Sequence, residues 1–108
     1  MEIEVIDKKA RIALHKDDVT NYQRLVKDVA NKIADVEMKA EGYSYSLSKN
    51  KKEIARFLPI IFGEENVLEG LIINLYDAII NAESVKQSIN THLNNCKGLN
   101  KVLIQTYY

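Results

Sequence analysis

The 108-residue sequence is poor in the residues that fix a chain by covalent or rigid backbone constraints. It has one cysteine, one proline, four glycines and no tryptophan. A single cysteine, Cys96, excludes an intramolecular disulfide and therefore the class of small secreted scaffolds that several disulfides hold together. The fold must rest on an apolar core, for which 46% hydrophobic residues are sufficient. A chain of this length predicts a single domain, residues 1–108.

The sequence also lacks an excess of either charge. Lysine plus arginine number 15 and aspartate plus glutamate number 15, so the formal net charge is zero. A small protein that mainly binds duplex DNA usually carries a basic excess, because neutralising phosphates supplies much of the affinity. The balance therefore argues against duplex DNA as the main partner.

No hydrophobic run is long enough to span a bilayer. The most apolar segment, residues 67–80, is interrupted by Glu69, Asn74 and Asp77. Residues 1–7 carry acids where a signal peptide carries lysines. We therefore expect a cytoplasmic protein with no membrane contact. Abundant lysine, asparagine and isoleucine have AT-rich codons, which suggests a source such as a low-GC bacterium, a phage or a mobile element.

Motifs for catalysis and for metal binding are missing as well. There is no glycine-rich phosphate loop, no HExxH and no recognisable nucleophile–histidine arrangement, so we expect no enzyme and no cofactor. His92 and Cys96 are four residues apart, but a structural zinc site needs four ligands and His15 is the only other histidine. We expect Cys96 to be a core residue, His92 an exposed polar residue, and no metal.

The two ends of the chain have the composition of strands. Residues 2–6 and 10–15 are β-branched runs, which predict a hairpin that turns at Lys8-Lys9 or through a four-residue loop in the same register. The tail, residues 101–108, is β-branched and aromatic. It predicts a last strand that joins the N-terminal hairpin.

Residues 18–40 carry apolar side chains at alternating spacings of three and four. This pattern predicts a long helix that begins at Asp17 or Asp18 and ends at Gly42. A seam of this length serves helical bundles and coiled coils alike, so it is either internal or an interface between copies. The predicted oligomer interface consists of Val19, Tyr22, Val26, Val29, Ile33 and Val36, and the seam continues to Ala40.

The middle of the chain gives weaker signals. Residues 43–47 alternate apolar and serine side chains, which fits an edge strand or an extended loop. Ile54, Phe57, Leu58 and Ile61 predict a helix with a kink at Pro59 and a stop at Gly63. A final helix is predicted from Glu64 to Cys96, either unbroken or restarting at Ser84, with Gly98 closing it.

These elements together predict an α+β fold. The N-terminal hairpin, joined by the C-terminal strand, packs with an antiparallel bundle of about three helices, one of them kinked at Pro59. An all-α helical bundle is the alternative.

One stretch, KKEIARFL (51–58), is similar to the first helix of a helix-turn-helix DNA reader. The likeness fails after it, because Pro59 occupies the turn and Glu64 and Glu65 open the next element with the wrong charge for phosphate. A basic cluster beside two tyrosines remains as the predicted polar contact site. It consists of Tyr43, Tyr45, Lys49, Lys51, Lys52 and Arg56.

The absent motifs and the surplus of apolar helix surface together predict a small non-enzymatic protein that binds a macromolecular partner. We expect an inhibitor or adaptor that also associates with itself as a homodimer or a higher oligomer. Two alternatives stay open. One is nucleic-acid binding through the basic cluster at Lys49–Arg56, and the other is an oligomer that sequesters a nucleotide or another small ligand.

Overall fold

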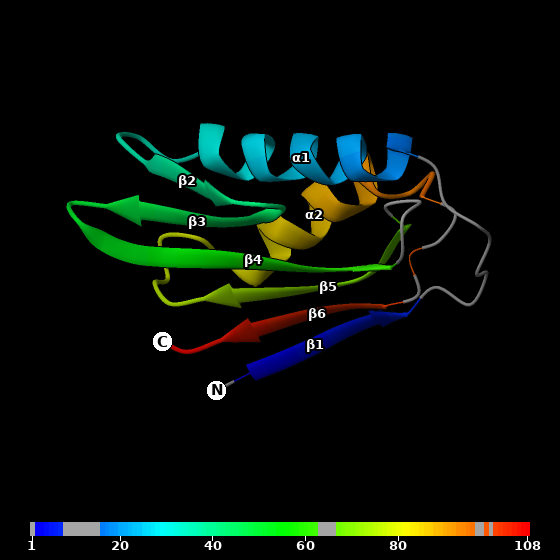
Figure 1. Cartoon of the computed structure of the whole chain (residues 1–108). Coiled ribbons are helices and arrows are strands. Elements are labelled where there is room, and N and C mark those ends of the chain that lie inside the picture. Colours follow the sequence, from blue (N-terminus) through cyan, green and yellow to red (C-terminus); the bar gives the residue numbers. More distant parts are fainter. Residues whose placement is uncertain (1, 8–15, 63–66, 97–98, 100) are drawn as a thin grey trace.

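The computed structural model describes residues 2–7, 16–62, 67–96, 99 and 101–108. Two helices and six strands make up the regular structure of this part of the chain (Figure 1). In order they are β1 (Glu2–Asp7), α1 (Lys16–Asn31), β2 (Glu37–Glu41), β3 (Ser44–Lys49), β4 (Lys52–Phe62), β5 (Val67–Leu75), α2 (Ala82–His92) and β6 (Lys101–Thr106).

The strands form one mixed sheet in the order β1-β6-β5-β4-β3-β2. Strands β2 to β5 are a run of antiparallel neighbours, as consecutive strands joined by short turns usually are. Helix α2 then carries the chain across the sheet, so β6 lies parallel to β5. β1 closes the far edge by pairing antiparallel with β6.

Both helices lie on one side of the sheet (Figure 1). Side chains alternate between the two faces of a strand, so every second residue of each central strand points toward the helices. Phe57 of β4, Ile73 of β5 and Ile104 of β6 are directly paired, and all three are 0% exposed. With buried residues of α1 and α2 they form the hydrophobic core.

The prediction of a three-helix bundle is wrong, and so is the all-α alternative. Lys52–Phe62, predicted as a kinked helix, is the eleven-residue strand β4, and Val67–Leu75, predicted as helix, is strand β5. Pro59 fits in β4 because β3 pairs only as far as Tyr45 opposite Phe57. Beyond that point β4 has only β5 as neighbour among the described strands, so the missing N–H of Pro59 removes no hydrogen bond to β3.

The predicted helix over residues 18–40 is too long. Helix α1 ends at Asn31, where the N–H groups of Lys32 and Ile33 donate to the carbonyls of Val29 and Ala30. Asp35 follows with a left-handed φ of 57°. The predicted seam residues Ile33, Val36 and Ala40 therefore lie off the helix, and Gly42, with φ 61°, turns between two strands.

The terminal strands are confirmed in part. β1 and β6 exist and pair as predicted, whereas residues 10–15, the predicted second strand of the hairpin, lie outside the described residues. Gly63 and Gly98, the predicted helix stops, lie outside them too. Residues 43–47 contribute to β3, which is an internal strand with neighbours on both sides.

Helix α2 is the only part of the predicted 64–96 helix that is helical in the described residues. It begins at Ala82, just before the predicted restart at Ser84, because the Asn81 side chain accepts the Ser84 N–H at 2.7 Å and caps the helix. Across the part of the chain that the structure describes, neither helix has the length and apolar character to cross a membrane.

Candidate binding surface

The predicted oligomer seam is mostly inside the chain. Val19, Tyr22, Val26 and Val29 are 0–6% exposed and pack between α1 and the sheet. Ile33 and Val36 are half-buried at the margin of this core. The four buried residues therefore stabilise the chain itself and offer no surface to a partner.

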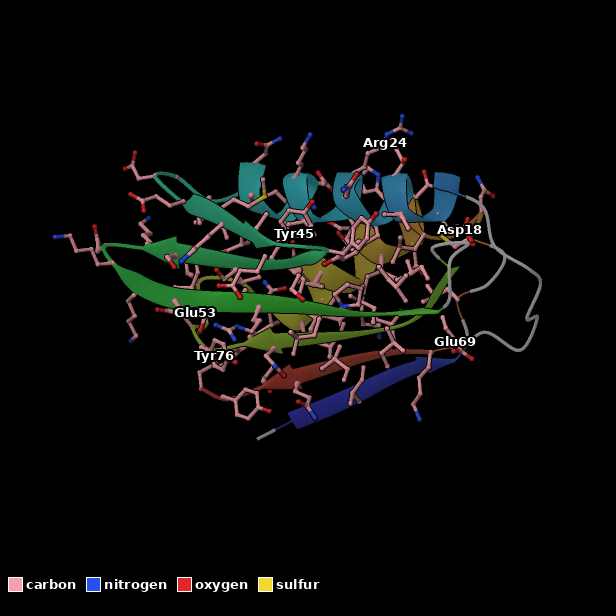
Figure 2. All side chains as sticks on the ribbon, viewed as in Figure 1. Asp18, Arg24, Tyr45, Glu53, Glu69 and Tyr76 are labelled. Carbon is pink, nitrogen blue, oxygen red and sulfur yellow. The ribbon has the colours of Figure 1, made fainter. Side chains whose placement is uncertain are left out.

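The structure divides the predicted basic and tyrosine cluster. Lys49, Lys51 and Lys52 lie at the hairpin between β3 and β4, whereas Tyr43 lies in the turn before β3. The length of β3, about 20 Å, separates the two ends. Tyr45 points to the helix side, and its ring centroid is 5.8 Å from that of Tyr22 (Figure 2).

Tyr22 anchors α1 to this part of the sheet. Its hydroxyl donates to the Tyr43 carbonyl oxygen at 2.6 Å, which satisfies a polar group that would otherwise be buried without a partner. Burial raises the pKa of Tyr22 far above its ordinary value, so it stays a hydrogen-bond donor. Tyr45 is thus part of the packing and not of a polar contact site.

The three lysines sit on a tight two-residue hairpin. Lys49 is paired with Lys52, and the two residues between them, Asn50 and Lys51, have φ values of 52° and 65°. Positive φ at both central residues is the signature of a type I′ turn. The lysines therefore belong to a hairpin tip.

Arg56, the last member of the cluster, lies on the side of the sheet away from the helices. Its Nε donates to the Glu53 carboxylate at 2.8 Å, and this hydrogen bond raises the pKa of the Arg56 guanidinium. Arg56 is paired with Ser46 of β3 on one side and with Asn74 of β5 on the other. Asn74 is paired in turn with Gln105 of β6.

This side of the sheet, which we call the open face, is covered by neither helix. Four polar side chains form a row across it, and four apolar side chains lie beside that row. The residues of the open face are Ser46, Arg56, Asn74 and Gln105 with Leu58, Ile60, Ile72 and Leu103.

Asn74 is the unusual member of the polar row. It is 9% exposed, and its Oδ1 has no hydrogen-bond partner among the described residues. A buried polar atom without a partner costs about 1–3 kcal/mol in proteins. Such groups are rare in proteins, so Asn74 Oδ1 marks a place where a group from outside the chain, a water molecule or a partner, can supply the hydrogen bond.

Two tyrosines flank Asn74 at the same end of the open face. The rings of Tyr76 and Tyr107 stack with centroids 5.4 Å apart, and the Tyr107 hydroxyl donates to Gln105 Oε1 at 2.8 Å. The Tyr76 N–H donates to the carbonyl oxygen of Ile54 at 2.9 Å, and Ile54 follows Glu53, the partner of Arg56. An aromatic pair, a guanidinium and a buried amide therefore meet in one place.

The apolar part of the open face is continuous across three strands. Leu58, Ile72 and Leu103 are paired neighbours and half-buried, and Ile60 beside them is 46% exposed. Gly70 is paired with Ile60, and a Cβ at Gly70 would lie 3.2 Å from Ile60 Cδ1. The glycine therefore lets Ile60 lie over β5, and it does so in a strand, where a helix was predicted over residues 64–96.

His92 and Cys96 do not form a pair. Helix α2 ends at His92, whose Nε2 lies 3.1 Å from Asp28 Oδ2, so this residue is half-buried in a contact between the helices and not simply exposed. Cys96 is a core residue, as predicted, with its Sγ 3.9 Å from the Asp18 carbonyl oxygen. Among the described residues, no three histidine, cysteine, aspartate or glutamate side chains gather as a metal site would require.

Asp28 is the centre of a polar network that joins the two helices. Lys32 Nζ donates to Ser88 Oγ at 2.7 Å and lies 3.6 Å from Asp28 Oδ2. Burial raises the pKa of Asp28, but the hydrogen bond from Ser88 and the positive charges of Lys32 and His92 lower it more, so the pKa is below its ordinary value. The network fixes the contact between α1 and α2.

Reasoning from the sequence proposed Arg56 as a contact residue and none of the other residues of the open face. The missed residues carry one signal, because Asn74 interrupts the apolar run LIINL (71–75) and was interpreted only as a break in a membrane-length segment. Comparisons with protein-family models, curated proteins and solved structures give no match. The surface itself is therefore the basis for any functional argument.

Proposed function

We propose that the protein binds a macromolecular partner through its open face and carries out no chemistry of its own. The observation that carries this proposal is the buried Asn74 Oδ1, which has no hydrogen-bond partner among the described residues, beside the apolar row Leu58, Ile72 and Leu103. Antiparallel strands that face water on one side usually alternate apolar and polar residues. Here the water side is apolar over three adjacent strands, which is typical of a surface that a partner covers.

The two kinds of side chain on the open face have different parts in such binding. The apolar row supplies area that leaves water on contact, at roughly 25 cal/mol per Å². Arg56, Asn74 and Gln105 supply polar groups that fix the register of the partner. An adaptor or inhibitor needs both, because apolar area alone does not select one partner.

The test compares two isoleucines of similar exposure. Ile60 lies on the open face and is 46% exposed, whereas Ile79 lies off it, in the connection to α2, and is 49% exposed. We expect crosslinked partners from the source cells to be captured by the wild type and by Ile79→Glu, and to be lost with Ile60→Glu. Equal capture by both variants would contradict the proposal.

A second candidate is single-stranded nucleic acid. It is favoured by the stacked pair Tyr76 and Tyr107 beside Arg56, because aromatic rings stack on bases and a guanidinium contacts phosphate. Tyr107 is 48% exposed and is accessible to a base.

Fluorescence anisotropy with labelled single-stranded DNA and RNA tests this candidate. We expect an affinity that falls as salt rises and falls again in Tyr107→Ala, with Tyr108→Ala as the control, since Tyr108 is also exposed but is not part of the stacked pair. No binding at low ionic strength would eliminate nucleic acid and leave the protein partner.

A further inference from the structure

Strand β2 is an edge strand that the described part of the chain leaves unprotected. All five of its residues, Glu37–Glu41, are exposed, and β3 is its only neighbour among the described strands. Figure 1 shows it at one margin of the sheet. The outer side of an edge strand presents N–H and C=O groups that pair readily with another strand.

The segment Val36–Ala40 alternates strictly between apolar and charged side chains. Met38 is paired with the buried Leu47, so Val36, Met38 and Ala40 belong to the helix side of the sheet. Glu37 and Lys39 are paired with Ser48 and Ser46, so they belong to the side of the open face. One glutamate and one lysine on the same side of a strand can pair with a second copy of themselves.

We propose that β2 pairs antiparallel with β2 of a second copy of this chain, about a two-fold axis at Met38. Glu37 then lies opposite Lys39 of the partner subunit, and Lys39 opposite Glu37 of the partner subunit. On the helix side, Met38 meets the partner's Met38 and Val36 meets the partner's Ala40. From Val36 to Ala40 every directly opposed pair is complementary, and such pairs are what stabilises neighbouring strands. Glu41 faces the partner's Asp35, which has a left-handed φ of 57° and precedes the strand, so the pairing ends before these two acids.

The neighbouring two-fold registers are worse. With the axis at Lys39, lysine opposes lysine and Glu37 opposes the partner's Glu41 twice, all like charges. With the axis at Ala40, Met38 must pair with Gly42, whose φ of 61° places it in the turn after β2. The register at Met38 instead extends to Val36, which immediately precedes the strand.

The surroundings of β2 suit a second copy. A hollow between the end of α1 and β2 is lined partly by Ala30, Ile33, Val36 and Met38, so apolar side chains of the partner gain contacts there. Met38 is 42% exposed in the single chain. The formal net charge of zero removes long-range repulsion between copies.

The contact is small. A five-residue strand extends for about 17 Å, and an interface of this length buries less than the roughly 800 Å² per partner of a standard stable complex. We therefore expect reversible association that depends on concentration. In the dimer both open faces lie on the same side of one continuous sheet, so a partner on the open face could be bound twice.

Charge reversal with rescue tests the register. Sedimentation velocity over a concentration series should show the wild type as a monomer–dimer equilibrium. Lys39→Glu and Glu37→Lys should each weaken dimerisation by at least about tenfold, because each replaces two attractive pairs with two repulsive ones. The double variant E37K/K39E should dimerise like the wild type, and K39E/E41K should not.

Mixing the two single variants gives a second readout. One chain then carries two lysines at positions 37 and 39 and the other carries two glutamates, so the mixture should form a heterodimer although neither variant dimerises well alone. A merely local effect on folding would not be repaired by mixing. Urea unfolding of each variant checks that the monomer remains folded.

The outcomes that overturn the proposal are specific. They are a wild type that stays monomeric at the highest concentrations, a dimer that Lys39→Glu leaves intact, or rescue by K39E/E41K in place of E37K/K39E. Ile60→Glu should leave the dimer unchanged, since Ile60 lies off the β2 edge. The proposal of a dimer and the proposal of an open-face partner are therefore tested independently.

Discussion

The two faces of the sheet are built from the same strands but differ in how far their side chains are buried. In β5, Ile73 faces the helices and is 0% exposed, whereas its neighbour Ile72 faces away and is half-buried. The difference comes from the two helices, which cover one face, and not from the residue type. One face holds the chain together, and the other is the face through which we propose that a partner binds.

The largest expected effect on stability compares the two faces at the adjacent isoleucines Ile72 and Ile73. Ile73→Ala should lower the free energy of unfolding by about 3–4 kcal/mol, because it leaves a cavity in the core between β5 and the helices. Ile72→Ala should lower it by about 1 kcal/mol, because water already reaches that side chain. Urea denaturation of both variants measures the difference.

Each of the two variants serves as the control for the other, since residue type, strand and substitution are identical. Similar losses for both variants would mean that the open face is buried in solution. The dimer proposed at the β2 edge would not bury it, so burial of Ile72 would indicate a different association through the open face.

A second prediction sharpens the comparison at Asn74, the buried polar residue of the open face. Asn74→Val should raise the free energy of unfolding by about 1 kcal/mol, because it removes from a central strand a buried oxygen that no described residue hydrogen-bonds. The same variant should lose affinity for the open-face partner.

Gln105→Val is the matched control, because the Gln105 side chain already accepts a hydrogen bond from Tyr107. It should bring no gain in the free energy of unfolding. A loss of stability in Asn74→Val would mean that the Asn74 side chain supports the fold, and would remove the main support for the open face as a binding surface.

The core strands were misjudged from sequence for a physical reason. Strand β5 is apolar on its covered face at Leu71, Ile73 and Leu75 and apolar again on its open face at Ile72. A strand that is apolar on both faces loses its period of two, and a run of apolar residues then matches a helical spacing by chance. The unusual chemistry of the open face is thus the cause of the error.

The segment after α1 did carry a usable signal. Val36, Met38 and Ala40 alternate with Glu37, Lys39 and Glu41, a strict period of two, but Val36 and Ala40 also continued the spacing of the preceding helix. The terminal strands were predictable, because short β-branched runs at the two ends of a chain have few other structures available.

Of the residues of the open face, which we propose as the binding surface, the sequence singled out only Arg56. Its other members come from β3, β5 and β6, and only the strand order brings Ser46, Asn74 and Gln105 into line with it. Pairing between strands far apart in sequence is set by the whole sheet and not by local composition. The basic and tyrosine cluster was predicted from residues that are close in sequence. The sheet separates them, because strand pairing and not closeness in sequence decides which side chains are neighbours.

The helix layer over the covered face should weaken in acid. Asp28 has a lowered pKa in the folded chain, so its contribution is complete above the pKa of the unfolded chain and is lost as the pH falls through the folded value. The free energy of unfolding should fall below about pH 4 by roughly 0.5–1 kcal/mol from this partly exposed group.

Asp28→Asn should remove that part of the pH dependence, whereas Asp77→Asn, outside the helix layer, should not. Chemical denaturation at several pH values compares the two. An unchanged acid slope in Asp28→Asn would show that the contact between α1 and α2 rests on apolar packing alone.

The smallest expected effect concerns the hairpin tip, which belongs to neither face. Lys51 has φ 65°, a conformation that glycine adopts without strain, and Asn-Gly is a preferred pair for a type I′ turn. Lys51→Gly should therefore raise the free energy of unfolding by about 0.5 kcal/mol, after the greater freedom of glycine in the unfolded chain is subtracted.

Lys52→Gly, one residue later and inside β4, should lower it by a similar amount, because strand backbone gains nothing from glycine. Both variants remove one lysine from the tip, so the opposite signs isolate the backbone from the charge. Both variants should bind the open-face partner like the wild type. A loss of binding in both would mean that the lysines of the hairpin also contact the partner.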